Sequence, residues 1–133
     1  MASVKTKFNL GALEAKVKAK VRDNMAAATL FVQGEATTSL SRGGRSGRLY
    51  KRGNVVHQAS APGEPPATDR RRLQGSMGSD VLVRAKEVIG FIFAQTNYAR
   101  ALELGTPKLK PRPFLRPAIL NNKRAILSLL RRK

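Results

Sequence analysis

The chain has 133 residues and no cysteine, and its 26 lysines and arginines against 8 aspartates and glutamates give a formal charge of +18. This length predicts one domain, residues 1–133, with a modest core, and the lack of cysteine excludes a disulfide or a thiolate metal site. A charge of this size attracts polyanions, so duplex DNA, an acidic protein ring and an anionic membrane surface are all open as partners.

Two further features of the sequence concern membrane insertion and secretion. The longest apolar run, residues 88–94, is far too short to span a membrane. Residues 1–10 carry lysines but no apolar segment typical of a secretory signal follows them. We therefore expect a protein made in the cytoplasm, with no membrane partner.

Groups for catalysis are scarce. Eight carboxylates and the single histidine, His57, offer no second ligand at metal-binding spacing, so we interpret His57 as structural. Glu103 and Tyr98 are five positions apart and would not be neighbours on a helix, so we expect Glu103 to bind an arginine or to cap the following loop. We expect no enzyme activity, no metal and no cofactor.

The first third of the chain predicts a long amphipathic helix, residues 8–40. Asn9 can cap its start, and Gly34 weakens it by about 1 kcal/mol relative to alanine, so it can bend or end there. The cations between residues 16 and 22 fit either a solvated face or a face that contacts a polyanion. Apolar residues recur every three or four positions: Leu10, Leu13, Val17, Val21, Met25, Ala28, Val32 and Ala36.

Residues 41–78 form a loop-rich basic segment. Glycines and cations crowd residues 41–54, which we expect to be a mobile loop or loose hairpin that orders against a neighbouring subunit, and which are too short for a specific RNA-binding segment. Residues 55–57 fit a short strand, residues 61–67 an irregular proline-rich loop, and the three arginines at 70–72 a loop or strand edge. The candidate polyanion-contacting residues are Arg42, Arg45, Arg48, Lys51, Arg52, Arg70, Arg71 and Arg72.

A change to alternating apolar residues predicts a β-hairpin within residues 79–95. Its strands are expected at 80–85 and 88–95, with the turn at Lys86 and Glu87. The second strand is apolar on both faces, so both must be covered. The first helix is the expected cover on one side, and a partner subunit on the other. We place Ile89, Phe91 and Phe93 on one face, and Val88 and Ile92 on the opposite face.

Residues 97–118 carry the most distinctive pattern. Residues 97–104 predict a short helix that Gly105 ends, and three prolines predict a stiff, extended arm over residues 106–113. Pro117 then suits the first turn of a last helix, residues 117–131. We interpret the block as an arm with two anchors that reaches another subunit, with packing along its own subunit as the alternative. It is formed by Tyr98, Leu102, Glu103, Gly105, Thr106, Pro107, Pro111, Pro113, Phe114, Leu115 and Pro117.

This block also resembles a known signature. Y-A-x-x-L-E-x-G-T, from Tyr98 to Thr106, and P-R-P-F-L-R-P-A, from Pro111 to Ala118, are similar to the closing motif of a tail-completion (neck) protein family of long-tailed bacteriophages. H-Q-A-S-A-P-G-E-P-P at 57–66 and L-Q-G-S-M at 73–77 resemble two further family segments. The family usually begins the third segment with Thr-Gly-x-Leu, where residues 69–73 here are D-R-R-R-L.

The expected fold is α+β, a long N-terminal helix packed on a small antiparallel β-sheet, with an extended proline-rich arm and a C-terminal helix. The resemblance implies a structural virion protein at the head–tail junction, joining the head connector to the tail. It also implies partners: copies of the chain in a ring, a head connector or stopper, and tail terminator or tube proteins. Double-stranded DNA passing the lumen would be contacted without sequence specificity. The alternatives are a tail terminator that caps the tail tube and a non-specific nucleic-acid-binding protein.

Overall fold

The computed structural model describes residues 10–42, 46–66 and 72–133. The expected α+β arrangement is confirmed, with one long helix, two small antiparallel hairpins and short helices near the C-terminus. In chain order the elements are α1 (Leu10–Arg42), β1 (Leu49–Arg52), β2 (Val55–Gln58), α2 (Arg72–Gly75), β3 (Met77–Val83), β4 (Val88–Ala94), α3 (Ala99–Leu104), α4 (Leu115–Leu120) and α5 (Lys123–Leu130).

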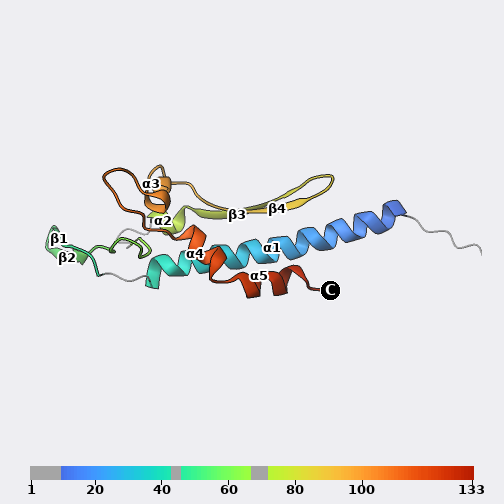
Figure 1. Ribbon diagram of the computed structural model, residues 1–133, viewed down its shortest axis with the longest axis horizontal. Helices are drawn as coiled ribbons and strands as arrows, with labels where there is room; N and C mark the ends of the chain where they lie inside the picture. The colour runs from blue at the N-terminus through green and yellow to red at the C-terminus, as the bar shows by residue number, and fades with distance from the viewer. Residues whose placement is uncertain (1–9, 43–45, 67–71) are drawn as a thin grey trace, which may run out of the picture.

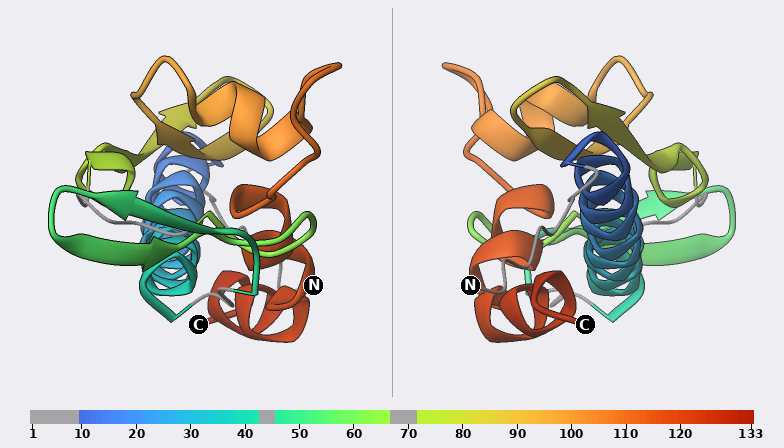
Figure 2. Two further views of the ribbon diagram at one scale, coloured as in Figure 1. Left: turned by 90° about the vertical axis from the view of Figure 1, so that its left-hand side faces the viewer. Right: turned by 90° about the vertical axis from the view of Figure 1, so that its right-hand side faces the viewer.

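Helix α1 forms the axis of the molecule (Figure 1). The β3–β4 hairpin lies along one side of it, and α4 and α5 lie along a neighbouring side, as the end-on views show (Figure 2). The β1–β2 hairpin projects at the end where α1 finishes, and the first turns of α1 extend at the opposite end (Figure 1). The result is an elongated body with two unlike ends.

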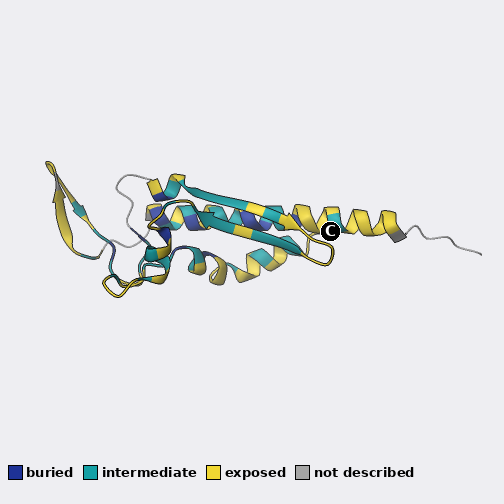
Figure 3. Cartoon of the chain, turned by 90° about the horizontal axis from the view of Figure 1, so that it is seen from above, coloured by how far each residue is buried: buried dark blue, intermediate teal, exposed yellow. Residues whose placement is uncertain are grey.

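Only the second half of α1 is packed. Its buried residues run from Asn24 to Leu40, whereas Leu13, Val17 and Val21 of the same apolar stripe are 55%, 54% and 42% exposed (Figure 3). The packed part of α1 begins at Asn24, next to the end of α5. There the Asn24 side-chain amide donates hydrogen bonds to the carbonyls of Leu130 and Arg132, at 3.2 and 2.7 Å. N-terminal to Asn24, α5 no longer accompanies α1.

The core therefore sits beside the C-terminal half of α1. One buried cluster joins Leu40, Leu73, Ala99 and Phe114, which come from four separate parts of the chain. A second joins Val32, Ala36 and Ala118, and the half-buried Met77 and Leu115 pack against both clusters. Burial of such side chains stabilises by about 1.5–3 kcal/mol each for the large ones, which makes these clusters the main source of tertiary stability.

The expected central hairpin is confirmed, but its first strand is shifted toward the N-terminus: it ends at Val83 rather than at residue 85, so the turn spans residues 84–87. β3 begins at Met77 rather than at residue 80, it pairs in register from Met77 with Ala94 to Val83 with Val88, and the turn closes through Arg84 N–H to the Glu87 carbonyl at 2.8 Å. Gly90 and Ile92 face α1. Since side chains alternate along a strand, Ile89, Phe91 and Phe93 share the outer face, as predicted.

The expected single C-terminal helix is wrong, because α4 and α5 are separate helices. The break falls at Asn121 and Asn122. The Asn122 side-chain amide donates to the Ala118 carbonyl at 2.9 Å, and asparagine competes in this way with the helical backbone for hydrogen bonds. The break lets Ala118 and the half-buried Ile126 both reach the cluster around Val32.

Of the two expectations for the basic segment after α1, a mobile loop or a loose hairpin, the structure shows a hairpin. Residues 49–58 form the hairpin β1–β2, which includes the expected strand at residues 55–57, and Gly53 turns it with a φ of 60°. Gly34, in contrast, neither bends nor ends α1. The prediction of a loop or strand edge at residues 70–72 is wrong for Arg72, which begins the one-turn helix α2. Arg70 and Arg71 lie outside the described residues.

Substitution by alanine should change the free energy of unfolding in opposite directions at two glycines. A Cβ on Gly90 would lie 2.3 Å from the Thr29 methyl carbon, and Thr29 cannot easily turn because its hydroxyl donates to the Met25 carbonyl at 2.7 Å. We expect Gly90→Ala to lower the free energy of unfolding by about 1–3 kcal/mol through overpacking. Gly34 has nothing within 4 Å, so Gly34→Ala should raise it by roughly 0.5–1 kcal/mol. Urea unfolding of both variants checks this, and equal effects would contradict the close packing of β4 on α1.

Candidate functional site

Side chains that can ligate a metal ion are dispersed over the described residues. Among them, no group of three or more His, Cys, Asp or Glu side chains could hold a metal ion. His57 stacks on Tyr50 within the β1–β2 hairpin, with ring centroids 5.6 Å apart. In the described part of the chain, no helix has the length and apolar character needed to cross a bilayer.

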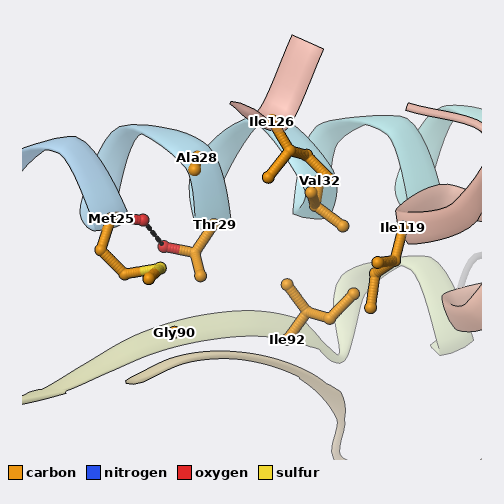
Figure 4. Close-up of a pocket in the computed structure, with 8 residues that line it drawn as sticks. All are labelled: Met25, Ala28, Thr29, Val32, Gly90, Ile92, Ile119 and Ile126. Atoms are coloured by element: carbon orange, nitrogen blue, oxygen red, sulfur yellow. Dashed lines mark hydrogen bonds between the residues drawn. The ribbon is translucent and has the colours of Figure 1, made fainter. Parts of the chain in front are cut away.

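An open apolar groove of about 140 Å³ lies between α1, β4 and the C-terminal helices (Figure 4). Thr29 carries the only hydroxyl on its lining, and that hydroxyl already donates to the α1 backbone. No polar group is therefore free to orient a small ligand. The groove is lined by Met25, Ala28, Thr29, Val32, Gly90, Ile92, Ile119 and Ile126.

The segments singled out in the sequence meet at one place, which we call the junction. It comprises the loop at residues 59–66, helix α2, helix α3 and residues 105–116, all at the C-terminal end of α1. Phe114 at its centre is 1% exposed and packs with Leu40, Leu73 and Ala99. Thus all three segments that carry the family resemblance contribute to a single structural unit.

The carboxylate of Glu103 holds the junction together. One oxygen accepts hydrogen bonds from the backbone N–H groups of Phe114 and Leu115 at 2.8 and 3.0 Å, and the other accepts from Arg116 N–H at 2.8 Å. These three donors begin helix α4, where backbone N–H groups have no partner inside the helix. The negative charge also suits the positive end of the helix dipole.

Pro117 completes this arrangement. It is the third residue of α4, and proline has no backbone N–H. The first four N–H positions of the helix are therefore all accounted for: three donate to Glu103 and the fourth is absent. The motif spacing E…F-L-R-P is thus explained by hydrogen bonding, and of the two expected roles for Glu103 the capping role is confirmed, with a helix as its target.

The expected extended arm at residues 106–113 needs correction at its start. Thr106 and Leu109 form an antiparallel bridge, with N–H to carbonyl distances of 2.7 and 3.1 Å in the two directions, so the chain turns at Pro107 and Lys108. Gly105 permits this with a φ of 77°, and a Cβ there would lie 2.8 Å from a Pro111 ring carbon. The prolines stiffen a segment that folds back.

The returning segment is tied to its own chain. Arg112 N–H donates to the Leu102 carbonyl at 2.7 Å, and its guanidinium donates to the carbonyl of the buried Ser60 at 3.2 Å. Gly63 N–H donates to the Pro111 carbonyl at 2.9 Å. In this structure residues 110–113 therefore pack along the parent subunit, the alternative to the predicted reach toward a neighbour.

A second carboxylate fixes the base of the β1–β2 hairpin. Glu64 accepts from Ala61 N–H at 2.8 Å, from Ser46 N–H at 3.2 Å and from the Ser46 hydroxyl at 2.5 Å. These hydrogen bonds, that from the Ser46 hydroxyl first, hold the pKa of Glu64 below its ordinary value of 4.5. Gly47 beside it has no room for a side chain, because a Cβ would lie 2.5 Å from the Ser60 carbonyl oxygen.

The predicted contact residues divide between core and surface. Phe114, Leu115 and Leu102 do anchor the block, but Tyr98 is 39% exposed and its neighbour Ala99 is buried in its place. The other members form the turn or follow it: Thr106, Pro107 and Pro111 are exposed, and Pro113 and Pro117 are half-buried.

Three of the predicted cationic residues have described side chains, and they lie on two separate elements. Arg48 and Lys51 are exposed at the β1–β2 hairpin, whereas Arg72 is exposed on α2. Arg42 and Arg52 end α1 and β1, and Arg45 lies outside the described residues, as do Arg70 and Arg71. The helix lysines and the C-terminal cations, Lys123 to Lys133, lie on other elements.

Sequence reasoning missed Glu64, Ser60 and Arg112, which tie the junction to the hairpin. Glu64 was inside a segment already singled out, flanked by Gly63 and two prolines, a composition typical of a turn that a carboxylate can close.

Comparisons with models of protein families, with curated proteins and with solved structures find no match to this chain.

Loss of the Glu103 carboxylate should be costly. Glu103→Ala leaves three helix-end N–H groups without their partner, so we expect the free energy of unfolding to fall by about 3 kcal/mol. Glu14→Ala is the matched control, because it removes the same charge from an exposed pair with Lys18 and should cost only about 0.3–0.5 kcal/mol. Chemical denaturation measures both, and equal losses would show that Glu103 does not cap α4.

The hairpin base should open in acid. Because the folded-state pKa of Glu64 is lowered, its contribution is complete above pH 4.5 and is lost as the pH falls through the folded value. We expect the protection factors of the Ser46 and Ala61 amides, which compare their exchange with that of an unstructured chain at the same pH, to fall below pH 4.5 while the amides of α1 stay protected. Hydrogen exchange followed by NMR checks this, with Glu64→Gln as the variant that should lose the pH dependence.

Proposed function

We propose that this chain is a structural subunit of the neck of a long-tailed bacteriophage, a tail-completion protein that joins the head connector to the tail. Its partners are copies of itself in a ring, a head connector or stopper on one side and tail proteins on the other. The biological identity rests on the sequence resemblance at residues 57–118. The structure supports the broader part, a subunit whose fold is completed by other molecules.

The observation that carries this proposal is the half-covered helix α1. One apolar stripe runs along it, and the half from Asn24 onward is the wall of the core. The half with Leu13, Val17 and Val21 points into solvent, although its spacing is the same. In proteins, an amphipathic helix gains most of its stability from the packing of its apolar face. A partner that covers the exposed stripe would supply that packing.

The junction supports the resemblance in a second way. Residues from all three segments that carry the resemblance meet there: Gly63 and Ser60 of the first hydrogen-bond Pro111 and Arg112 of the third, and Leu73 of the second packs with Phe114 of the third. A motif whose parts are distant in sequence but are joined by hydrogen bonds or by packing in this way is typical of a fold signature. Its residues hold the shape of the subunit, which leaves the contacts between subunits to the exposed surfaces.

A genetic experiment tests the proposal. Disrupting the gene for this chain in its phage should give DNA-filled heads and free tails in micrographs, and supplying the chain in trans should restore joined particles. Val17→Asp should fail to restore them, because it puts a charge on the exposed stripe where a partner would desolvate it. Joining efficiency should fall by roughly tenfold or more, as expected for a central interface residue.

The matched control is Ala19→Asp. Ala19 is exposed on the same turns of α1, and two residues rotate the helix by about 200°, so its side chain is away from the stripe. It should restore joined particles as well as the parent chain. Intact particles with Val17→Asp, or a virion that lacks the chain altogether, would overturn the proposal. Tails of abnormal length would identify the chain as a tail terminator instead.

A further inference from the structure

The outer face of the β3–β4 hairpin is apolar and uncovered. It carries Ile89, Phe91 and Phe93 from β4 and Leu82 from β3, and Phe91 and Leu82 are 44% and 40% exposed. Helix α1 covers the opposite face, and no helix or strand of the described chain lies over this one (Figures 1 and 3). A strand as apolar on both faces as β4 is typical of a sheet that is buried on both sides.

The charge of this region indicates the kind of partner. Residues 73–99 hold two acidic and two basic residues, within a chain that carries +18. A face without net positive charge is unsuited to phosphate contacts, which need lysine or arginine. It is also a place where a second copy of a strongly cationic chain can approach without strong repulsion.

A surface that could occupy this face is present elsewhere on the same chain. In the β1–β2 hairpin, Leu49, Val55 and Val56 are all more than half exposed, and none of the described helices or other strands packs extensively against it. An isolated two-stranded hairpin is marginally stable in water. Its base is nevertheless fixed by Glu64 and by the bonds between Gly47, Ala59 and Arg48, and it points away from its own body (Figure 1).

The two surfaces are complementary in chemistry. Because side chains alternate and Lys51 pairs with Val56, one face of the β1–β2 hairpin carries Leu49, Lys51 and Val56. The outer face of β3–β4 carries an acid among its apolar residues, Asp80, which pairs with Phe91 in register. The Asp80 carboxylate accepts from the backbone N–H of its neighbour Val81, at 2.8 Å, and is exposed.

We propose that the Leu49–Lys51–Val56 face of one copy's β1–β2 hairpin docks on the outer face of β3–β4 in the next copy, with Lys51 beside Asp80. The contact is between unlike surfaces, so it repeats from copy to copy and closes as a ring or extends as a filament. It rests on the proposed function in that the chain acts as a multi-copy subunit, and it names which surfaces meet.

Sedimentation of the purified full chain over a range of concentrations tests the contact without any phage. Phe91→Asp and Val56→Asp should each weaken self-association by roughly 30-fold or more, the loss expected for an interface hot spot. Val55→Asp is the matched control, since it makes the same change at the adjacent, exposed residue on the other face of the hairpin. It should associate as the parent chain does, and all three variants should keep the parent's thermal unfolding at dilutions where the parent is monomeric.

Mixing the two defective variants identifies the geometry. Val56→Asp retains an intact sheet face and Phe91→Asp an intact hairpin, so together they should form a heterodimer with the parent's affinity and grow no further. Charge exchange provides a second readout: Lys51→Glu and Asp80→Lys should each weaken association, and the double variant should recover it. A monomeric parent chain, a monomeric mixture, or equal effects of Val55→Asp and Val56→Asp would overturn the inference.

Failure of the contact and failure of the neck assignment have different signatures. If Val56→Asp associates normally while Val17→Asp still blocks the joining of heads and tails, the contact is wrong and the neck function stands. If the mixture forms the heterodimer but virions do not contain the chain, the contact stands and the neck function is wrong.

Discussion

The structure depends on one carboxylate. Glu103 accepts three backbone N–H groups at the start of α4, eleven to thirteen residues further along the chain. A helix of six residues has no stability of its own in water, so α4 forms where its first turn is satisfied and its apolar side is buried. With α4 fixed, Phe114 enters the cluster with Leu40 and Leu73, and Ala118 meets α1 beside Val32. Without it, the C-terminal segment would lose the point from which it packs on α1.

Elements with a local signal could be predicted from the sequence. The period of α1, the apolar run of β4 and the glycine that ends α3 each determine structure through neighbouring residues. The break between α4 and α5 was missed because asparagine is tolerated in many helices, and only its bond to the Ala118 carbonyl reveals it. The three prolines predict one extended run, whereas Pro107 occupies a turn between Thr106 and Leu109, which form a bridge.

The candidate site was less predictable, for two physical reasons. The partners of Glu103 and Glu64 lie too far along the chain for any rule of helical spacing to find them, although both residues stood inside conspicuous segments. The apolar stripe of α1 has the same spacing in its buried and exposed halves, so its pattern cannot reveal where the cover ends. That limit is set by the length of α5 and by the bonds from Asn24 to the Leu130 and Arg132 carbonyls.

The distribution of charge determines which surfaces can contact another copy of the chain and which can contact polyanions. Copies that each carry +18 repel one another, so an association between them needs faces with little net charge and enough apolar area to offset the repulsion. The outer face of β3–β4 meets both conditions, whereas the cations on α1 and at the C-terminus lie elsewhere. In the proposed assembly, homotypic contact therefore leaves those cations free for an acidic neighbouring ring or for DNA in the lumen. Contacts with DNA of this kind would be electrostatic, sensitive to salt and independent of sequence.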